Sequence, residues 1–199
     1  MSDRPKTSTT LERHPLEPFF PAGAKLLMLG TFPPGRERWC MDFFYPNFQN
    51  DMWRIFGAVF FADLQHFVAE GKKAFDKARL ENFLRLKKIA LYDTAVSVRR
   101  LRGNASDAFL EICEPFDLAS ALARLPECSS IAATGKKAAE TLAEICKTRA
   151  PSAGGSVRVK FAGREFDFYA MPSSSRAYPK PVSQKAQFYA DMFKRAGIL

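Results

Sequence analysis

The sequence predicts a layered α/β domain whose core is a mainly parallel sheet of about four strands. Short apolar runs of strand type alternate along the chain with segments in which apolar residues recur every three to four positions, as in amphipathic helices. The chain has 199 residues, of which 47% are hydrophobic and 26% charged, the profile of a folded globular protein. A chain of this length can bury a large core in one domain without disulfides or metals.

Three apolar runs and one hairpin-like segment account for the predicted strands. The runs cover residues 24–32, 88–97 and 129–135; the second is expected to end as a strand at Asp93. Residues 157–175 are typical of a hairpin-like pair followed by a strand, with Gly163 in the turn.

The predicted helices lie between and after these strands. They cover residues 50–61, 72–88, 106–112, 116–125, 136–150 and 183–199. Asn50 or Asp51 would cap the first helix, and Ser106 and Asp117 stand near the starts of two others. Residues 1–22 are polar and contain several prolines, so we expect an N-terminal arm that docks loosely, followed by a single domain over residues 23–199.

An excess of basic residues favours a polyanionic partner. The 30 Lys and Arg residues against 21 Asp and Glu give a net charge of +9 and a pI near 9.5, which suits nucleic acid. The alternative is a charge that serves solubility alone. No apolar run approaches the roughly 20 residues that a bilayer span needs, and the N-terminus lacks a signal-peptide core. We therefore expect a cytoplasmic protein with no membrane partner.

The four cysteines do not form a metal or redox motif. Cys40, Cys113, Cys128 and Cys146 include no C-x-x-C pair. A role as small buried hydrophobic side chains in a reducing compartment best explains Cys113, Cys128 and Cys146. An iron–sulfur cluster is the poorly supported alternative. His14 and His66 are isolated and fit surface or packing positions better than catalysis. We expect no metal and no cofactor.

Four polar or irregular segments follow the apolar runs. They are GTFPPG (30–35), YDTAVS (92–97), ATGKKA (133–138) and MPSSSRAYP (171–179). In open α/β sheets, ligands bind beyond the carboxyl ends of the strands, so these segments are expected to converge on one rim. The first of them lacks the glycine spacing and the Lys-Ser/Thr pair of a phosphate-binding loop.

An aromatic and amide-rich patch follows the first strand. Asn47 and Asn50 lie among four aromatic side chains: Phe43, Phe44, Tyr45 and Phe48. Aromatic faces with a few amide groups suit a flat heterocycle, because the rings stack on it and the amides bond to its edge. The alternative is a second hydrophobic core, with Asn50 acting as a helix cap rather than in catalysis.

Further polar groups suit the binding of a nucleotide. Ser173, Ser174, Ser175 and Arg176 can bind phosphate oxygens, or can be an ordinary surface turn. Asp93 can accept from a donor on a base, orient water or cap a turn. Lys136 follows Gly135 at a predicted helix start, where a phosphate could bind; a solvated face is the alternative.

These segments together resemble the uracil-DNA glycosylase superfamily, and most closely its hypoxanthine-DNA (deoxyinosine) glycosylase branch. "LMLGTFPPG" is similar to the first motif of the superfamily and "MPSSSRAYP" to the second. Residues 44–53, "FYPNFQNDMW", resemble the branch's aromatic segment, and "ALYDTAVSVRRLRGNASDAFLE" its strand-Asp segment. The resemblance extends over residues 24–195. It implies a three-layer αβα domain with a central, mainly parallel four-stranded sheet.

The resemblance also implies a function. A monofunctional glycosylase would flip a deaminated base, hypoxanthine or uracil, out of DNA and hydrolyse its N-glycosidic bond. Phe32 stands where many superfamily members have a catalytic Asp or Asn. In the hypoxanthine branch an Asn of the aromatic segment has this role instead, and Asn47 matches it. The expected base pocket contains Thr31, Phe32, Phe44, Tyr45 and Asp93, and the expected phosphate contacts are Ser173, Ser174, Ser175, Arg176 and Lys136. Phe48 stands where the branch has a proline. This difference would alter either the pocket wall or the activity.

Two other functions stay open from the sequence. A non-catalytic nucleic-acid-binding module on the same fold would explain the loss of the usual acid at Phe32. A hydrolase or transferase acting on a free nucleotide would use similar aromatic and phosphate-binding groups. The resemblance implies a monomer whose partner is DNA containing deaminated bases.

Overall fold

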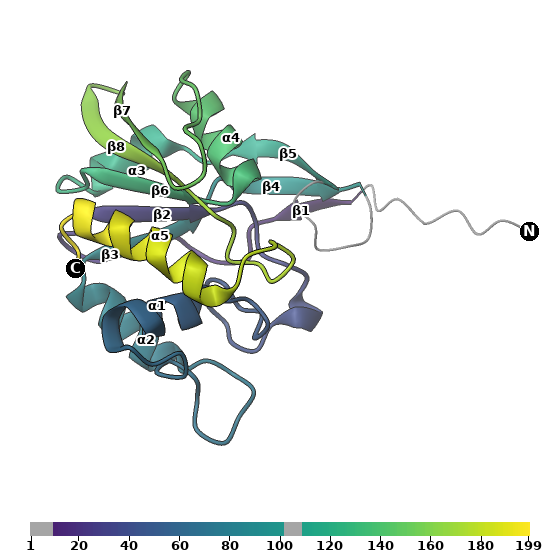
Figure 1. Ribbon diagram of the computed structural model, residues 1–199. Helices are drawn as coiled ribbons and strands as arrows, with labels where there is room; N and C mark the ends of the chain where they lie inside the picture. Colours follow the sequence, from purple (N-terminus) through teal and green to yellow (C-terminus); the bar gives the residue numbers. More distant parts are fainter. Residues whose placement is uncertain (1–9, 102–108) are drawn as a thin grey trace, which may run out of the picture.

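The computed structural model describes residues 10–101 and 109–199 and is built around one five-stranded sheet (Figure 1). In sheet order the strands are β3 (Ile89–Asp93), β2 (Leu26–Gly30), β6 (Ser130–Thr134), β8 (Arg164–Met171) and β7 (Ser156–Phe161). The first four run parallel, and β7 pairs antiparallel with β8 at the edge. The predicted four parallel strands are confirmed, and the hairpin adds an antiparallel fifth.

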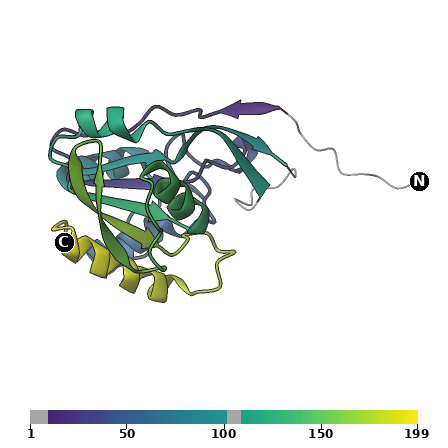
Figure 2. The same cartoon turned by 90° about the horizontal axis from the view of Figure 1, so that it is seen from above.

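Helices cover both faces of this sheet. They are α1 (Met52–Phe61), α2 (Lys77–Leu86), α3 (Leu118–Arg124), α4 (Lys136–Ile145) and α5 (Val182–Arg195). Figure 2 shows α3 and α5 on opposite sides of the sheet, so the predicted three-layer αβα arrangement is confirmed. All residues of β2, β3 and β6 are buried, which is why these strands are continuous apolar runs rather than alternating ones.

A second, three-stranded antiparallel sheet was not expected. It consists of β1 (Leu11–Arg13), β4 (Ala95–Arg100) and β5 (Leu110–Pro115), in the order β1-β4-β5. The chain after Asp93 therefore continues as a strand instead of forming a loop. The helix predicted for residues 106–112 is wrong where the structure describes it, because Leu110 and Ile112 alternate with the exposed Glu111 as in a strand. Ser106, its expected cap, lies outside the described residues.

Residues 10–22 are attached more firmly than a loosely docked arm. Strand β1 pairs antiparallel with β4, from Leu11 opposite Arg99 to Arg13 opposite Ser97. Phe19 exchanges two backbone hydrogen bonds with Leu91 of the central sheet, at 2.9 and 3.0 Å. The boundary between arm and domain at residue 22 stays a prediction.

Helix starts follow the capping residues that the sequence offers. Of the two predicted capping residues at α1, Asp51 holds the N-cap position without a side-chain capping bond, and the Asn50 side chain just before it accepts a hydrogen bond from the Met52 N–H at 2.8 Å. Asp117 caps α3, and Asp76 caps α2, so α2 begins at Lys77 rather than near residue 72. Within the described ranges, every helix is too short or too polar to cross a membrane.

Burial of acidic protons predicts a loss of stability at high pH. Burial raises the pKa of the Cys128 and Cys146 thiols to about 11. Burial, with a smaller contribution from the Asp93 carboxylate, raises the pKa of Tyr92 to about 12. In the unfolded chain these groups lose their protons at lower pH than in the folded protein. Unfolding therefore releases protons in this range, and stability falls as pH rises.

We expect the melting temperature to fall progressively between about pH 9 and pH 12, since the unfolded-state values lie near 9 for thiols and 10 for phenols. Circular dichroism melts at a series of pH values measure this. In the double variant Cys128→Ala, Cys146→Ala the fall between pH 9 and 10 should be shallower. A melting temperature of the natural chain that is constant up to pH 11 would contradict the assignment.

Candidate active site

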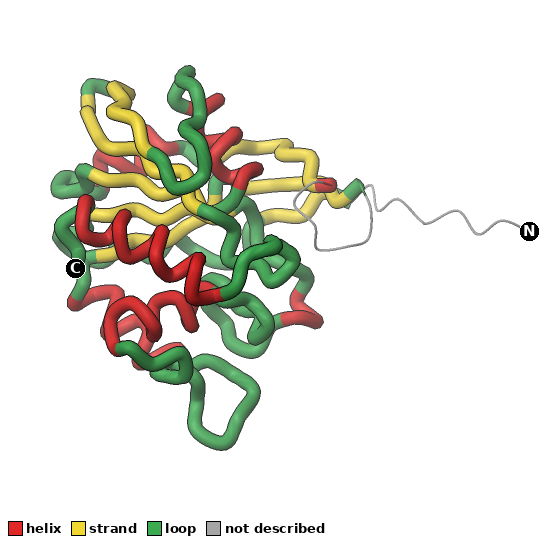
Figure 3. Tube along the Cα trace, viewed as in Figure 1, coloured by secondary structure: helices red, strands yellow, loops and turns green. Residues whose placement is uncertain are grey.

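A cavity of about 630 Å³ opens at the carboxyl ends of the central strands. Figure 3 shows the loops that follow β2 and β8 at this edge of the sheet. The walls of the cavity come from the loop after β2, the aromatic patch, the ends of β3 and β6, and the turn after β8. The lining residues are Gly30, Thr31, Phe32, Pro33, Pro34, Arg38, Phe44, Tyr45, Pro46, Asn47, Asn50, Asp93, Thr134, Ser173, Ser174, Ser175, Ala177, Tyr178 and Pro179.

The aromatic patch divides between core and cavity. Phe43 is buried and stacks on Trp53, with ring centroids 6.2 Å apart, so it belongs to the core. Phe44 and Tyr45 line the cavity. Tyr45 has a φ of 48°, unusual for a residue with a Cβ, and its hydroxyl is 2.9 Å from the Thr134 Oγ1 at the end of β6. This hydrogen bond fixes the Tyr45 ring across the carboxyl end of the sheet.

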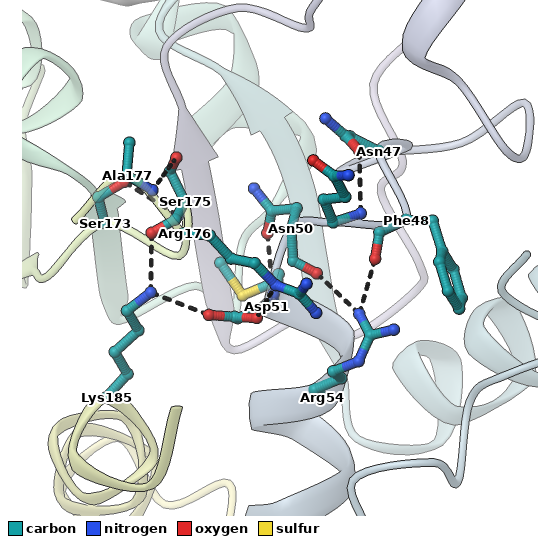
Figure 4. A network of polar contacts seen from close by, with 12 residues as sticks. Asn47, Phe48, Asn50, Asp51, Arg54, Ser173, Ser175, Arg176, Ala177 and Lys185 are labelled. Atoms are coloured by element: carbon teal, nitrogen blue, oxygen red, sulfur yellow. Dashed lines mark hydrogen bonds and ion pairs between the residues drawn. The ribbon is translucent and has the colours of Figure 1, made fainter. Parts of the chain in front are cut away.

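Asn47 lies in the cavity wall, half-buried. Its side-chain carbonyl accepts a hydrogen bond from the Gln49 N–H at 2.9 Å, which holds the carboxamide in one orientation (Figure 4). A carbonyl oxygen has two lone pairs, so this bond leaves the oxygen able to accept a second hydrogen. The same side chain carries two N–H donors.

Phe48 points into a hydrophobic cluster instead of the cavity. Its ring lies 5.2 Å from that of Phe75, and the Arg54 guanidinium stands 4.6 Å from its centroid. Arg54 also donates to the Phe48 carbonyl at 2.8 Å. The Phe48 ring therefore packs beneath the aromatic patch, and its neighbours form the cavity wall.

The loop after β2 brings backbone and an aromatic ring to the cavity. Thr31 is buried, and Phe32 packs on a small cluster formed by Ala95, Val98 and Leu110 of the second sheet. Arg100 of β4 donates to the Pro33 carbonyl at 2.8 Å. The second sheet thus supports the loop from behind and provides an apolar surface against which the Phe32 ring is buried.

Asp93 ends β3 opposite Gly30 and lines the cavity. A side chain at position 30 would collide with the Asp93 Oδ1, so the glycine makes room for this carboxylate. The Asp93 Oδ2 lies 2.8 Å from the Nε2 of His14, whose side chain is 1% exposed. His14, which looks isolated in the sequence, was not expected at the site, and no spacing indicates this contact because the two residues are 79 positions apart.

The turn after β8 places three serines on the opposite wall. Ser175 N–H donates to the Ser173 hydroxyl at 3.2 Å, and Ala177 N–H donates to the Ser175 hydroxyl at the same distance. Tyr189 of α5 donates to the Pro172 carbonyl at 2.9 Å, and burial raises its pKa well above its usual value, so it stays a donor. The turn is therefore fixed by its own hydroxyls and by α5.

A buried ion cluster joins this turn to the start of α1 (Figure 4). Asp51 binds Arg176 Nε at 3.1 Å and Lys185 Nζ at 3.0 Å, and its backbone N–H donates to the Ser174 carbonyl at 3.0 Å. Lys185 is fully buried and also donates to the Ser175 carbonyl at 2.8 Å. The cluster thus holds the serine turn and the asparagine segment in a fixed relation across the cavity.

The two basic residues expected at phosphates differ in position. Arg176 follows the serine turn but does not line the cavity; it lines a second hollow beside Lys185, where its Nε binds Asp51 and 54% of its side chain is exposed. Lys136 does not line the cavity; its side chain is 89% exposed and lies 3.7 Å from Glu140 one turn further along α4. Neither basic residue therefore lines the cavity, although Arg176 directly follows the serine turn that does.

Comparison with known proteins identifies a shared fold. A scan against protein-family models finds no match, and neither does a search of the curated proteins. Among solved structures, the chain is similar to the solution NMR structure of a candidate uracil DNA glycosylase from Methanosarcina acetivorans. The TM-score is 0.60 at 19% identity, over 94% of this chain and 99% of the other. This chain therefore has the fold of that uracil-DNA-glycosylase-like structure along nearly its whole length.

Proposed function

We propose that this protein is a monofunctional DNA glycosylase that removes a deaminated base, hypoxanthine or uracil, from DNA. The observation that carries the proposal is the single cavity that joins Asn47, the aromatic wall and the serine turn. Asn47 and the aromatic wall come from one segment, and the serine turn lies more than 100 residues further along the chain. They are the parts that base excision needs: a reacting group, a stacking surface and a hold on the DNA backbone.

The cavity suits a flipped nucleotide. Its volume of about 630 Å³ lies within the range of small-molecule sites. In the proposed complex the flipped base stacks on Phe44 or Tyr45. The Asp93 carboxylate accepts from a ring N–H of the base, a group that hypoxanthine and uracil carry next to a carbonyl. Adenine and cytosine have a bare ring nitrogen there, which a carboxylate repels, so Asp93 favours the deaminated forms.

Asn47 serves the chemical step in this proposal. As the N-glycosidic bond stretches, positive charge develops on the sugar and negative charge on the departing base. The Asn47 amide donates to the base, or its carbonyl orients the water whose oxygen bonds to C1′; the base leaves with the bonding electron pair and takes up a proton. A water nucleophile fits the cavity, because no lysine lines it among the described residues.

The serine turn and Arg176 bind the DNA backbone in this scheme. Hydroxyls, backbone N–H groups and a half-exposed guanidinium are the usual phosphate ligands, and they carry no base preference. The net charge of +9 adds sequence-independent attraction to DNA. The proposed partner is thus DNA with a deaminated base, bound by a monomer.

A panel of oligonucleotides tests this function. Duplexes and single strands carry one uracil, hypoxanthine or xanthine, or a mismatch, and strand scission after alkali reports base release. We expect release from a hypoxanthine or uracil substrate and intact abasic strands before alkali treatment. Binding of DNA without release from any substrate would indicate the non-catalytic module. Tight binding of mononucleotides that does not depend on duplex length would indicate an enzyme of free nucleotides.

A further inference from the structure

His14 is the one residue of the N-terminal segment whose side chain bonds to a group lining the cavity, among the described contacts. The imidazole is 1% exposed and packs among three aromatic rings: Tyr92 at 4.5 Å, Phe32 at 5.4 Å and Phe44 at 6.2 Å between centroids. A packing residue in that environment would need no polar atoms. A buried polar ring persists only where its nitrogens are bonded, and both are bonded here.

The bonds of the two ring nitrogens have different roles. Nε2 faces the Asp93 carboxylate at 2.8 Å, and a carboxylate can only accept, so Nε2 carries a proton. Nδ1 lies 2.9 Å from the Leu16 carbonyl and 3.2 Å from the Leu16 N–H. Leu16 thus provides an acceptor if Nδ1 is protonated and a donor if it is not. Donation from Nε2 to Asp93 persists in either protonation state of the ring.

Asp93 is thereby held through one oxygen and given room at the other. His14 binds Oδ2, and Oδ1 lies over Gly30, where any side chain would collide with it. The bond to His14 thus sets the orientation of a carboxylate that lines the cavity. The backbone of β3 is paired with β2 up to Gly30 and Asp93. A shift of the Asp93 side chain therefore cannot be compensated by a movement of the strand.

We infer that His14 is a positioning residue for Asp93, so that the N-terminal segment completes the base-binding wall. The inference rests on the proposed function. His14 touches neither substrate nor reacting atoms in this scheme. It acts by keeping the Asp93 carboxylate aimed as an acceptor, and misplacement of such a group by about 1 Å can cost about 100-fold in rate.

The test is a double-mutant cycle between His14 and Asp93. His14→Phe keeps an aromatic ring among its aromatic neighbours but removes the donor, whereas His14→Gln keeps an N–H in reach of the carboxylate. We expect His14→Phe to lower kcat/KM by about 100-fold relative to the natural chain. The loss in His14→Gln should be much smaller, because this variant keeps a donor to the carboxylate. In an Asp93→Asn background, His14→Phe should change kcat/KM by less than about threefold, because the group it acts through is gone.

A merely structural role gives a different pattern. It would lower the melting temperature together with the activity, and His14→Phe would cost the same factor with Asn at position 93 as with Asp. That additive outcome, or an unchanged kcat/KM in His14→Phe, would overturn the inference while leaving the proposed function intact. If His14→Phe does not fold, His14→Leu takes its place in the cycle. Absence of base release by the natural chain would overturn both proposals together.

Discussion

Replacing Asn47 with Ala is expected to lower kcat/KM for base release by about 100- to 1,000-fold, the usual cost of one group that stabilises charge in a transition state. The reason is geometric. Asn47 lines the cavity, and the Gln49 N–H fixes its carboxamide at 2.9 Å, so removing the side chain leaves no second amide in the same place. The affinity for DNA should change little, because the serine turn and Arg176 are untouched. Single-turnover release and equilibrium binding on one lesion duplex measure both quantities.

Gln49→Ala is the matched control. Its side chain is exposed and its contact with Asn47 is made by the backbone N–H, which the substitution keeps. We expect its kcat/KM to stay within about twofold of the natural chain, as for other surface substitutions. If Asn47→Ala retained full activity, the reacting group would have to be sought elsewhere in the cavity. Equal losses in both variants would point to the loop as a whole rather than to the amide.

Replacing Asp51 with Asn is expected to cost about 3–5 kcal/mol in the free energy of unfolding, the range for breaking a buried ion pair. Lys185 is fully buried, and after the substitution its ammonium keeps only neutral partners, among them the Ser175 carbonyl at 2.8 Å. A loss of this size corresponds to a fall of about 6–20 °C in the melting temperature for a chain of this length. Thermal and urea unfolding measure it.

Lys185→Met provides the comparison. It removes the buried ammonium, and Asp51 keeps Arg176 at 3.1 Å, so its carboxylate is not left unpaired. The loss of stability should therefore be clearly smaller than in Asp51→Asn, because an apolar side chain can replace a buried charge at little cost. If both variants lose the same amount, the cluster acts as one unit through the serine turn. A stability loss under 1 kcal/mol in Asp51→Asn would show that Lys185 finds other compensation.

The regular elements could be predicted well because their signals are local. Continuous apolar runs identified β2, β3 and β6, and 3.6-residue periodicity identified α1, α3, α4 and α5, with Asp117 as the predicted cap of α3. The errors came where two patterns compete over a short stretch. Residues 106–112 contain a cap-like Ser and apolar residues that fit a helix or a strand equally, and pairing of Leu110 with Arg100 of β4 decided the part that is described.

The sequence by itself determined the α/β fold, the carboxyl-end rim and the residues that gather there, because strand direction in a parallel sheet places every following loop at one edge. Only the tertiary structure decided which of those residues share a cavity. It separated Lys136, Arg176 and the ring of Phe48 from the cavity, and it brought in His14 across 79 residues. Such contacts depend on the second sheet and on buried charge pairing. Neither produces a periodic pattern in the sequence, because the residues that make these contacts are far apart along the chain.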